Sequence, residues 1–176
     1  VLYGGELEQA IPGFSTTDGK RRFLEDPAWQ PTRRYLERLA SITDWAETVV
    51  AVNICFEPLI GSLLRREVLI RLAGSFGDAA TPTVGQVAQA EWGWVRDWSA
   101  ALVRFMLNDA AHADANSGQI ADWLADWGAM ARDAIDALEP VLTEVDPGYA
   151  DTRERINQDH VGLLQECGLK PSEVAV

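Results

Sequence analysis

Carboxylates and imidazoles are the side chains most often used for metal and acid–base chemistry, and this chain is rich in the first and poor in the second. It contains 27 aspartates and glutamates but only two histidines, His112 and His160. A carboxylate-bridged di-iron centre in a helical bundle needs a Glu-x-x-His pair from each of two helices, because residues three apart project from one helical face. None of the thirteen glutamates is followed by a histidine three positions later, and Asp109 is the only aspartate that is. Because a second pair is missing, we expect no metal ligands in this chain.

The Asp109–His112 pair lies in a polar segment at the predicted end of a long helix. We interpret it as a solvated helix terminus, where His112 would be a favourable cation near the negative end of the helix dipole. The alternative is a small enzyme that uses Asp109, His112 and nearby carboxylates on a small molecule or a metal. The sequence contains neither a Gly-x-Ser-x-Gly turn nor a phosphate-binding glycine loop. We therefore predict no catalytic, cofactor-binding or metal-binding residues.

Tryptophans are concentrated on two of the predicted helices. Trp92, Trp94 and Trp98 crowd one helix, and Trp123 and Trp127 stand four residues apart on the next. Aromatic platforms that stack bases or sugars normally have a basic or hydrogen-bonding surround, whereas acidic residues dominate near these positions. We predict that the tryptophans pack helices together or form a subunit interface.

Two polar residues, Asn53 and Glu57, stand four apart in the most apolar stretch of the chain, and Arg65 and Arg66 follow two turns later. Polar side chains need partners when they are buried. One interpretation is that an arginine across the bundle or across a subunit boundary holds Glu57. The other is a solvated stripe along the helix, and the sequence leaves both open.

Apolar residues recur with the period of an α-helix over most of the chain, and no alternating strand pattern of useful length occurs. We predict an all-α fold with three parts: an irregular N-terminal arm with one or two helical turns (1–32), a bundle of four to five helices (33–168) and a C-terminal tail (169–176). The predicted helices span about 32–42, 44–72, 84–107, 117–142 and 152–167.

Local signals refine two of these helices. Thr43 is the expected N-cap of the helix over 44–72, and Thr81 or Thr83 that of the helix over 84–107. Pro58 should kink the first of them or interrupt a backbone hydrogen bond near Ile54, because proline has no N–H.

The charge and the apolar content exclude several classes of function. With 15 basic against 27 acidic residues, the formal charge is −12 at pH 7, which disfavours binding to nucleic acid or to an anionic membrane surface. The apolar stretch 48–64 carries Asn53, Glu57 and Pro58, which argues against a membrane span. We expect neither a nucleic-acid nor a membrane partner.

The two cysteines and the first residues indicate the compartment. Cys55 and Cys167 can form at most one bridge, and Cys55 lies in an apolar run where a buried free thiol is the commoner state. The opening residues do not resemble a signal peptide, and the first residue, Val1, indicates a processed, trimmed or fragmentary chain. We expect a reducing, cytoplasmic setting.

A dense motif occupies residues 43–61, TDWAETVVAVNICFEPLIG, with a core of Asp44-Trp45, Glu47, Ala51, Asn53 and Phe56-Glu57-Pro58-Leu59. It resembles the signature of the β (small hydroxylase) subunit of soluble bacterial multicomponent di-iron monooxygenases. Further similarity precedes it at Glu25-Asp26-Pro27 and follows it at Ala80-Thr81-Pro82 and Ala111-His112-Ala113-Asp114. The pattern is most similar to actinobacterial propane and alkene monooxygenases and covers about residues 1–142.

The resemblance implies a ferritin-like helical fold and a non-catalytic structural role in an NADH- and O2-dependent hydrocarbon hydroxylase. In this family the di-iron centre belongs to the catalytic α subunit, against which the small subunit packs in an α2β2-type assembly. A reductase with FAD and an iron–sulfur cluster supplies electrons from NADH, and a coupling protein gates the reaction. No cofactor is expected in this chain itself.

The small subunit of that family is roughly twice as long, and this chain resembles its C-terminal half. Half of a ferritin-like unit would expose apolar surface unless the rest of the subunit or another chain covered it. Two alternatives to a structural subunit stay open at this point, a freestanding acidic helical adaptor and the small enzyme built on Asp109 and His112.

Overall fold

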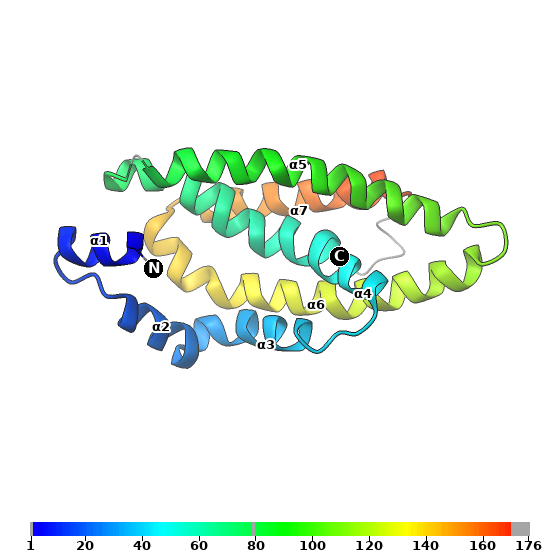
Figure 1. Ribbon diagram of the computed structural model, residues 1–176, viewed down its shortest axis with the longest axis horizontal. Coiled ribbons are helices and arrows are strands. Elements are labelled where there is room, and N and C mark those ends of the chain that lie inside the picture. Colours follow the sequence, from blue (N-terminus) through cyan, green and yellow to red (C-terminus); the bar gives the residue numbers. More distant parts are fainter. Residues whose placement is uncertain (1, 79, 170–176) are drawn as a thin grey trace.

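The computed structural model in Figure 1 is an elongated bundle of helices, and residues 2–78 and 80–169 of it are described. The chain begins with three short helices, which are α1 (Leu2–Ala10), α2 (Thr16–Glu25) and, after the 3₁₀ turn η1 (Pro27–Trp29), α3 (Gln30–Leu39). A central helix follows, made of α4 (Trp45–Val49), η2 (Val50–Gly61) and η3 (Leu63–Ile70), and then the 3₁₀ turn η4 (Ala73–Phe76). The last three helices are α5 (Ala80–Leu107), α6 (Ala113–Val145) and α7 (Tyr149–Glu166). No strand occurs within these ranges, which confirms the all-α prediction.

The central helix begins at Asp44 rather than at the predicted cap, Thr43. The Asp44 carboxylate accepts hydrogen bonds from the backbone N–H groups of Ala46 (2.7 Å) and Glu47 (3.3 Å). Its backbone is extended, as an N-cap requires. The cap of α5 also differs, because Asp78 accepts from Ala80 N (3.0 Å) and Thr81 N (2.9 Å) in place of a threonine cap.

Pro58 lies inside the central helix without ending it, because η2 and η3 have the wider turns of a π-helix. A proline interrupts the helical hydrogen-bond ladder, and π-type turns are one way in which a helix accommodates that defect. The backbone oxygen of Ile54, four residues earlier, accepts a hydrogen bond from His160 Nε2 of α7 at 2.9 Å. The carbonyl near which the sequence predicted an interrupted hydrogen bond therefore accepts one from a side chain near the other end of the chain.

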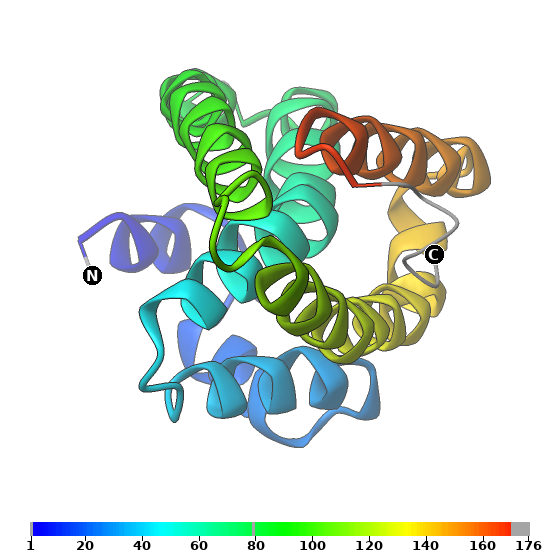
Figure 2. The ribbon, with the colours of Figure 1, turned by 90° about the vertical axis from the view of Figure 1, so that its right-hand side faces the viewer.

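The core forms around this helix, as the end-on view in Figure 2 shows, with α5, α6 and α7 arranged about it. Its fully buried residues include Ile54, Leu59 and Leu63, which belong to one hydrophobic cluster with Trp127 and Leu138 of α6. By length and composition alone, the segment Trp45–Ile70 could cross a membrane, but half of the residues in its most apolar stretch are buried inside the bundle. The core position explains this apolar character.

The N-terminal arm is more helical than the sequence predicted, because α1 and α2 together span most of it. Ser15 caps α2 by accepting from Asp18 N (3.2 Å), and Arg21 and Arg22 both bind the Asp18 carboxylate. No residue of α2 is buried. A helix held by its cap and its surface ion pairs has no apolar stripe, so periodicity did not reveal it. The arm and bundle boundaries at 32 and 168 remain predictions, and residues 170–176 of the predicted tail lie outside the described residues.

Candidate functional site

The Asp109–His112 pair forms a turn between two helices rather than a helix end. Helix α5 stops at Leu107 and α6 starts at Ala113, earlier than predicted, so His112 sits at the positive end of the α6 dipole. The interpretation of His112 as a cation at a negative helix end was therefore wrong. Asp109 Oδ1 accepts from the backbone N–H of His112 (2.9 Å) and lies 3.1 Å from its Nδ1. The hydrogen bond from Ala111 N (2.8 Å) to the same carboxylate, together with the contacts to His112, lowers the pKa of Asp109, and the exposed pair closes a turn.

Asn53 and Glu57, the polar residues of the central helix, are both partnered. Asn53 Nδ2 donates to Ser99 Oγ of α5 at 2.9 Å, and Glu57 forms an ion pair with Arg65 Nη1 at 2.8 Å. Arg65 belongs to the same helix, so Glu57 is held neither across the bundle nor in a solvated stripe. Gly61 leaves room for this pair, because a Cβ there would lie 2.6 Å from the Glu57 carboxylate. The Glu57 to Gly61 part of the motif thus has a packing function.

A buried carboxylate that the sequence analysis missed binds three arginines at the C-terminal end of the central helix. Glu67 of η3 is 5% exposed and accepts hydrogen bonds from three arginines. These come from Arg66 Nε (2.8 Å), Arg71 Nε (2.9 Å) and Arg155 Nη2 of α7 (3.0 Å). Burial raises the pKa of Glu67, but the hydrogen bonds from Arg155 and Arg66 outweigh it, so the pKa is lowered overall. The carboxylate therefore stays charged and holds η3 against α7.

The same cluster reaches the turn between α6 and α7. Arg71 also pairs with Asp146, whose carboxylate accepts from Thr152 Oγ1 (2.8 Å) and Gly148 N (3.1 Å). Burial opposes ionisation of Asp146, yet Arg71 and Thr152 lower its pKa overall. We call this group, Glu67, Arg66, Arg71, Asp146, Thr152 and Arg155, the Glu67 cluster. Its members come from three separate parts of the chain, and the only local signal for it was the Glu67–Arg71 spacing of four residues.

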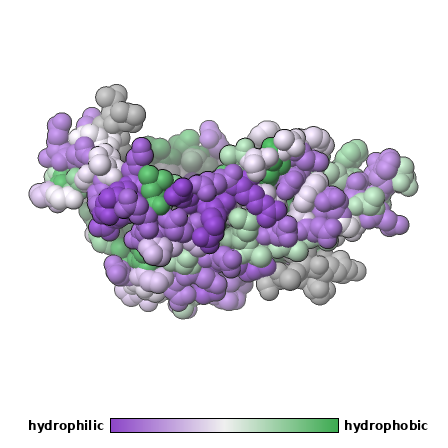
Figure 3. All heavy atoms as spheres, turned by 90° about the horizontal axis from the view of Figure 1, so that it is seen from below, coloured by the Kyte–Doolittle hydropathy of each residue, from purple (hydrophilic) through white to green (hydrophobic). Residues whose placement is uncertain are grey.

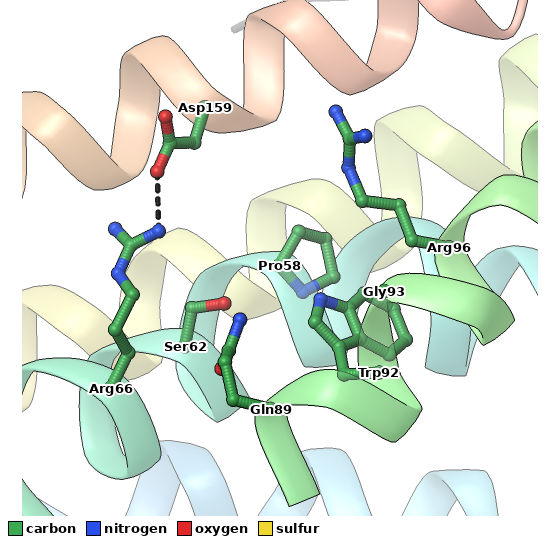
Figure 4. A pocket seen from close by; sticks show the side chains of 8 residues that line it. All are labelled: Pro58, Ser62, Arg66, Gln89, Trp92, Gly93, Arg96 and Asp159. Atoms are coloured by element: carbon green, nitrogen blue, oxygen red, sulfur yellow. Dashed lines mark hydrogen bonds and ion pairs between the residues drawn. The ribbon is translucent and has the colours of Figure 1, made fainter. Parts of the chain in front are cut away.

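A cavity of about 260 Å³ lies between the central helix, α5 and α7, and Figure 4 shows the side chains around it. Arg66 reaches across to Asp159 of α7, with Nη1 and Oδ2 2.6 Å apart. Arg96 extends from α5 towards α7, where it pairs with Glu166 at 2.8 Å. Because an acid of α7 neutralises each arginine, the cavity offers no uncompensated charge to an anionic ligand. Trp92 forms one wall of it.

The second cluster of interactions joins α3, the central helix and α6. Trp127 is fully buried, and its Nε1 donates to Glu47 Oε1 of α4 at 3.0 Å. The Arg38 guanidinium lies 4.4 Å from the Trp127 ring centroid, and the Tyr35 ring 4.9 Å from it. Tyr35 Oη donates to the backbone oxygen of Ala51 at 2.7 Å. Trp127 thus packs helices together, as predicted, whereas Trp94 and Trp98 remain exposed.

The donor set of the described residues does not fit a di-iron centre. No group of three or more His, Cys, Asp or Glu that could hold a metal is found in 2–78 and 80–169. His160 is buried and binds the Ile54 carbonyl, and burial lowers its pKa to about 4. Cys55 and Cys167 are free and buried, and burial raises the pKa of each thiol to about 12. The polar groups in the interior serve the packing of helices.

The sequence matches known proteins over nearly its whole length. The model of the methane/phenol/alkene hydroxylase family matches residues 1–110. The hydroxylase component small subunits of propane 2-monooxygenase from Mycolicibacterium goodii and Rhodococcus jostii are 35% and 36% identical to it, each over 96% of this chain and 47% of the relative. An oxygenase component of phenol 2-monooxygenase from a Pseudomonas species is 30% identical over 96% of this chain and 48% of its own length.

These matches agree with the motif over residues 43–61 and with the helical bundle built around it. The chain spans about half the length of the curated relatives that it matches. The family's fold is the ferritin-like helical fold that the resemblance implied. The chain therefore belongs to the methane/phenol/alkene hydroxylase family.

Proposed function

We propose that this chain is a non-catalytic structural part of the hydroxylase component of an NADH- and O2-dependent hydrocarbon monooxygenase of the propane or alkene type. The observation that carries the proposal is the similarity to propane 2-monooxygenase small subunits over 96% of the chain. The interior is consistent with it, because His160 and Tyr35 bind backbone carbonyls and Glu67 binds arginines, so that these buried groups hold helices together.

The proposed partner is a catalytic α subunit that holds the di-iron centre, within an assembly of the α2β2 type. A coupling protein and a reductase that carries FAD and an iron–sulfur cluster would complete the system and draw electrons from NADH. A cytoplasmic location belongs to the same proposal. In this proposal oxygen activation belongs to the catalytic subunit, and the contribution of this chain is to brace that subunit through rigid packing. The Glu67 cluster and the Trp127 contacts stiffen the two ends of the central helix for that task.

Metal analysis of the purified proteins tests this division of labour. We expect iron to copurify with the catalytic partner, and no stoichiometric iron with this chain alone. Two irons bound per isolated chain would refute the proposal. Sedimentation of the isolated chain addresses the adaptor alternative, which requires a well-folded monomer that forms no complex with a catalytic subunit.

Turnover by the assembled complex tests the enzyme alternative. His112→Ala should leave hydrocarbon oxidation nearly unchanged, because His112 only closes an exposed turn with Asp109. Gln158→Ala, at an exposed position of α7, is the matched control for surface substitution. A loss of turnover specific to His112→Ala, with the complex intact, would favour an active site on this chain.

A further inference from the structure

One side of α5 carries large apolar residues that are exposed along the whole helix. Val84 is 71% exposed, Trp94 71% and Phe105 72%, and Val87 and Trp98 are 61% and 47% exposed. We define the α5 seam as the exposed positions that alternate in steps of three and four residues: Val84, Val87, Glu91, Trp94, Trp98, Ala101 and Phe105.

The spacing of the seam is that of a helix–helix contact. Steps of three and four average to 3.5 residues, the repeat with which one helix packs along another. From its first to its last residue the seam is about 30 Å long, at a rise of about 1.5 Å per residue. The other side of α5 is already occupied, since Trp92, Ser99 and Val103 are buried against the bundle. Helix α5 thus has two packing sides, and the described residues cover only one of them.

A groove continues the seam at its N-terminal end. It has a volume of about 550 Å³ and lies between η3 and α5, where Leu69, Val84 and Ala88 line it. Leu69 is itself 44% exposed. Seen from below in Figure 3, the face of the molecule is by contrast mainly hydrophilic, with scattered apolar patches. Folded proteins rarely leave a long apolar stripe of this kind uncovered.

The length of the relatives indicates what covers the seam. The chain aligns over 96% of its length with small subunits of which it spans 47%, so each relative contains about as much polypeptide again without a counterpart here. We propose that a helix from that other half of the small subunit, whether on the same polypeptide or on a separate one, packs lengthwise on the α5 seam and fills the adjoining groove.

Charge argues for this occupant over a second copy of the chain. Glu91, the third of the seven seam positions, interrupts the apolar residues and would best face a lysine or arginine. In a parallel pair of seams the two Glu91 carboxylates would face each other. A second copy would also bring another net charge of −12 to the contact. A helix with an apolar stripe and one basic residue opposite Glu91 fits the seam in both respects.

Site-specific photo-crosslinking in the assembled hydroxylase tests the proposal. The probe is p-benzoyl-phenylalanine in place of Trp94 or Phe105, and the control carries it in place of Asp122, an exposed residue of α6. We expect Trp94 and Phe105 to crosslink to a peptide that aligns with the unmatched half of the propane 2-monooxygenase small subunits. A crosslink to α5 of a second copy, a crosslink to the catalytic subunit, or no crosslink at all would overturn the proposal.

Charge substitutions on the seam give an independent measurement. Trp94→Glu should reduce the yield of the crosslink formed from p-benzoyl-phenylalanine at position 105 by at least about tenfold, because aromatic side chains carry much of the energy of a buried contact. Asp97→Asn, on the same helix but off the seam and with its side chain 80% exposed, should have little effect. Equal crosslink yields in both variants, with unchanged circular dichroism, would contradict the inference. A crosslink to the catalytic subunit would refute this inference and leave the proposed function intact. Two irons bound per isolated chain would refute the proposed function and leave this inference intact.

Discussion

Replacing Glu67 by glutamine removes the charge at the centre of the Glu67 cluster while keeping the size of the side chain. The Glu67 carboxylate is 6% exposed and accepts one hydrogen bond from each of Arg66, Arg71 and Arg155. A glutamine offers a single acceptor oxygen, and its amide N–H groups would face arginine donors. Arg66 and Arg71 keep Asp159 and Asp146 as partners, whereas within the described part of the chain Arg155 keeps only its hydrogen bond to Thr152.

The size of the expected loss of stability follows from the burial of the Glu67 carboxylate and of the three arginines that bind it. Removing one partner of a fully buried ion pair costs about 3–5 kcal/mol. Here the arginine side chains are 32%, 40% and 47% exposed, so water replaces part of what Glu67 supplies. We expect Glu67→Gln to lower the free energy of unfolding by about 2–3 kcal/mol. At a slope of about 2 kcal/mol per molar urea, the unfolding midpoint would fall by about 1 M or slightly more.

Urea unfolding followed by circular dichroism measures this change. The matched control is Glu37→Gln, since Glu37 also pairs with an arginine four residues away, but with its side chain 59% exposed. That surface pair should contribute less than about 1 kcal/mol. A loss below about 0.5 kcal/mol for Glu67→Gln, or equal losses for both variants, would refute the assignment of Glu67 as the centre of a buried cluster.

The structure also predicts how the stability difference between the parent and Glu67→Gln changes with pH. The pKa of Glu67 is lowered in the folded protein, so the unfolded chain takes up the proton first as the pH falls. The stabilisation by Glu67 is thus fully present above the unfolded pKa of about 4.3 and is lost as the pH falls through the lower, folded value. The difference between the parent and Glu67→Gln should be constant from pH 7 to about pH 5 and shrink below that. A difference that grows on acidification would contradict the structure.

Three further predictions concern other buried groups. His160→Leu should cost about 1–3 kcal/mol, because the buried hydrogen bond from His160 Nε2 to the Ile54 carbonyl is lost. Burial lowers the pKa of His160 to about 4, so between about pH 6.5 and pH 4 only the unfolded chain binds the proton, and the parent should lose stability as the pH falls. His160→Leu should lack this loss of stability when urea unfolding is compared at pH 7 and pH 5. Tyr35→Phe should cost about 1 kcal/mol in the same assay, since one buried hydrogen bond to the central helix is lost; no change would contradict that contact. Cys55 and Cys167 should react with a thiol reagent only after denaturant is added, because both thiols are buried and their pKa values are raised to about 12; rapid labelling of the native chain would contradict their burial.

The sequence predicted those parts of the fold in which neighbouring residues carry the information. Apolar periodicity found the central helix and the three long helices, because every turn of such a helix repeats the same buried face. The motif over residues 43–61 was sufficient to assign the family. Helix α2 was missed because it has no buried residue, so its cap and surface ion pairs produce no apolar period.

Only the tertiary structure decided which polar groups meet. His160 binds Ile54 across 106 positions, and Arg155 and Asp146 reach Glu67 and Arg71 across 88 and 75 positions. No local pattern specifies such pairs, because they depend on which helix faces lie together once the chain has folded. The division of the tryptophans is of the same kind: Trp92 and Trp127 are buried, whereas Trp94 and Trp98 stay exposed on the seam. An apolar stripe shows that a helix has a side to bury, but whether the chain itself covers that side depends on helices far away in the sequence.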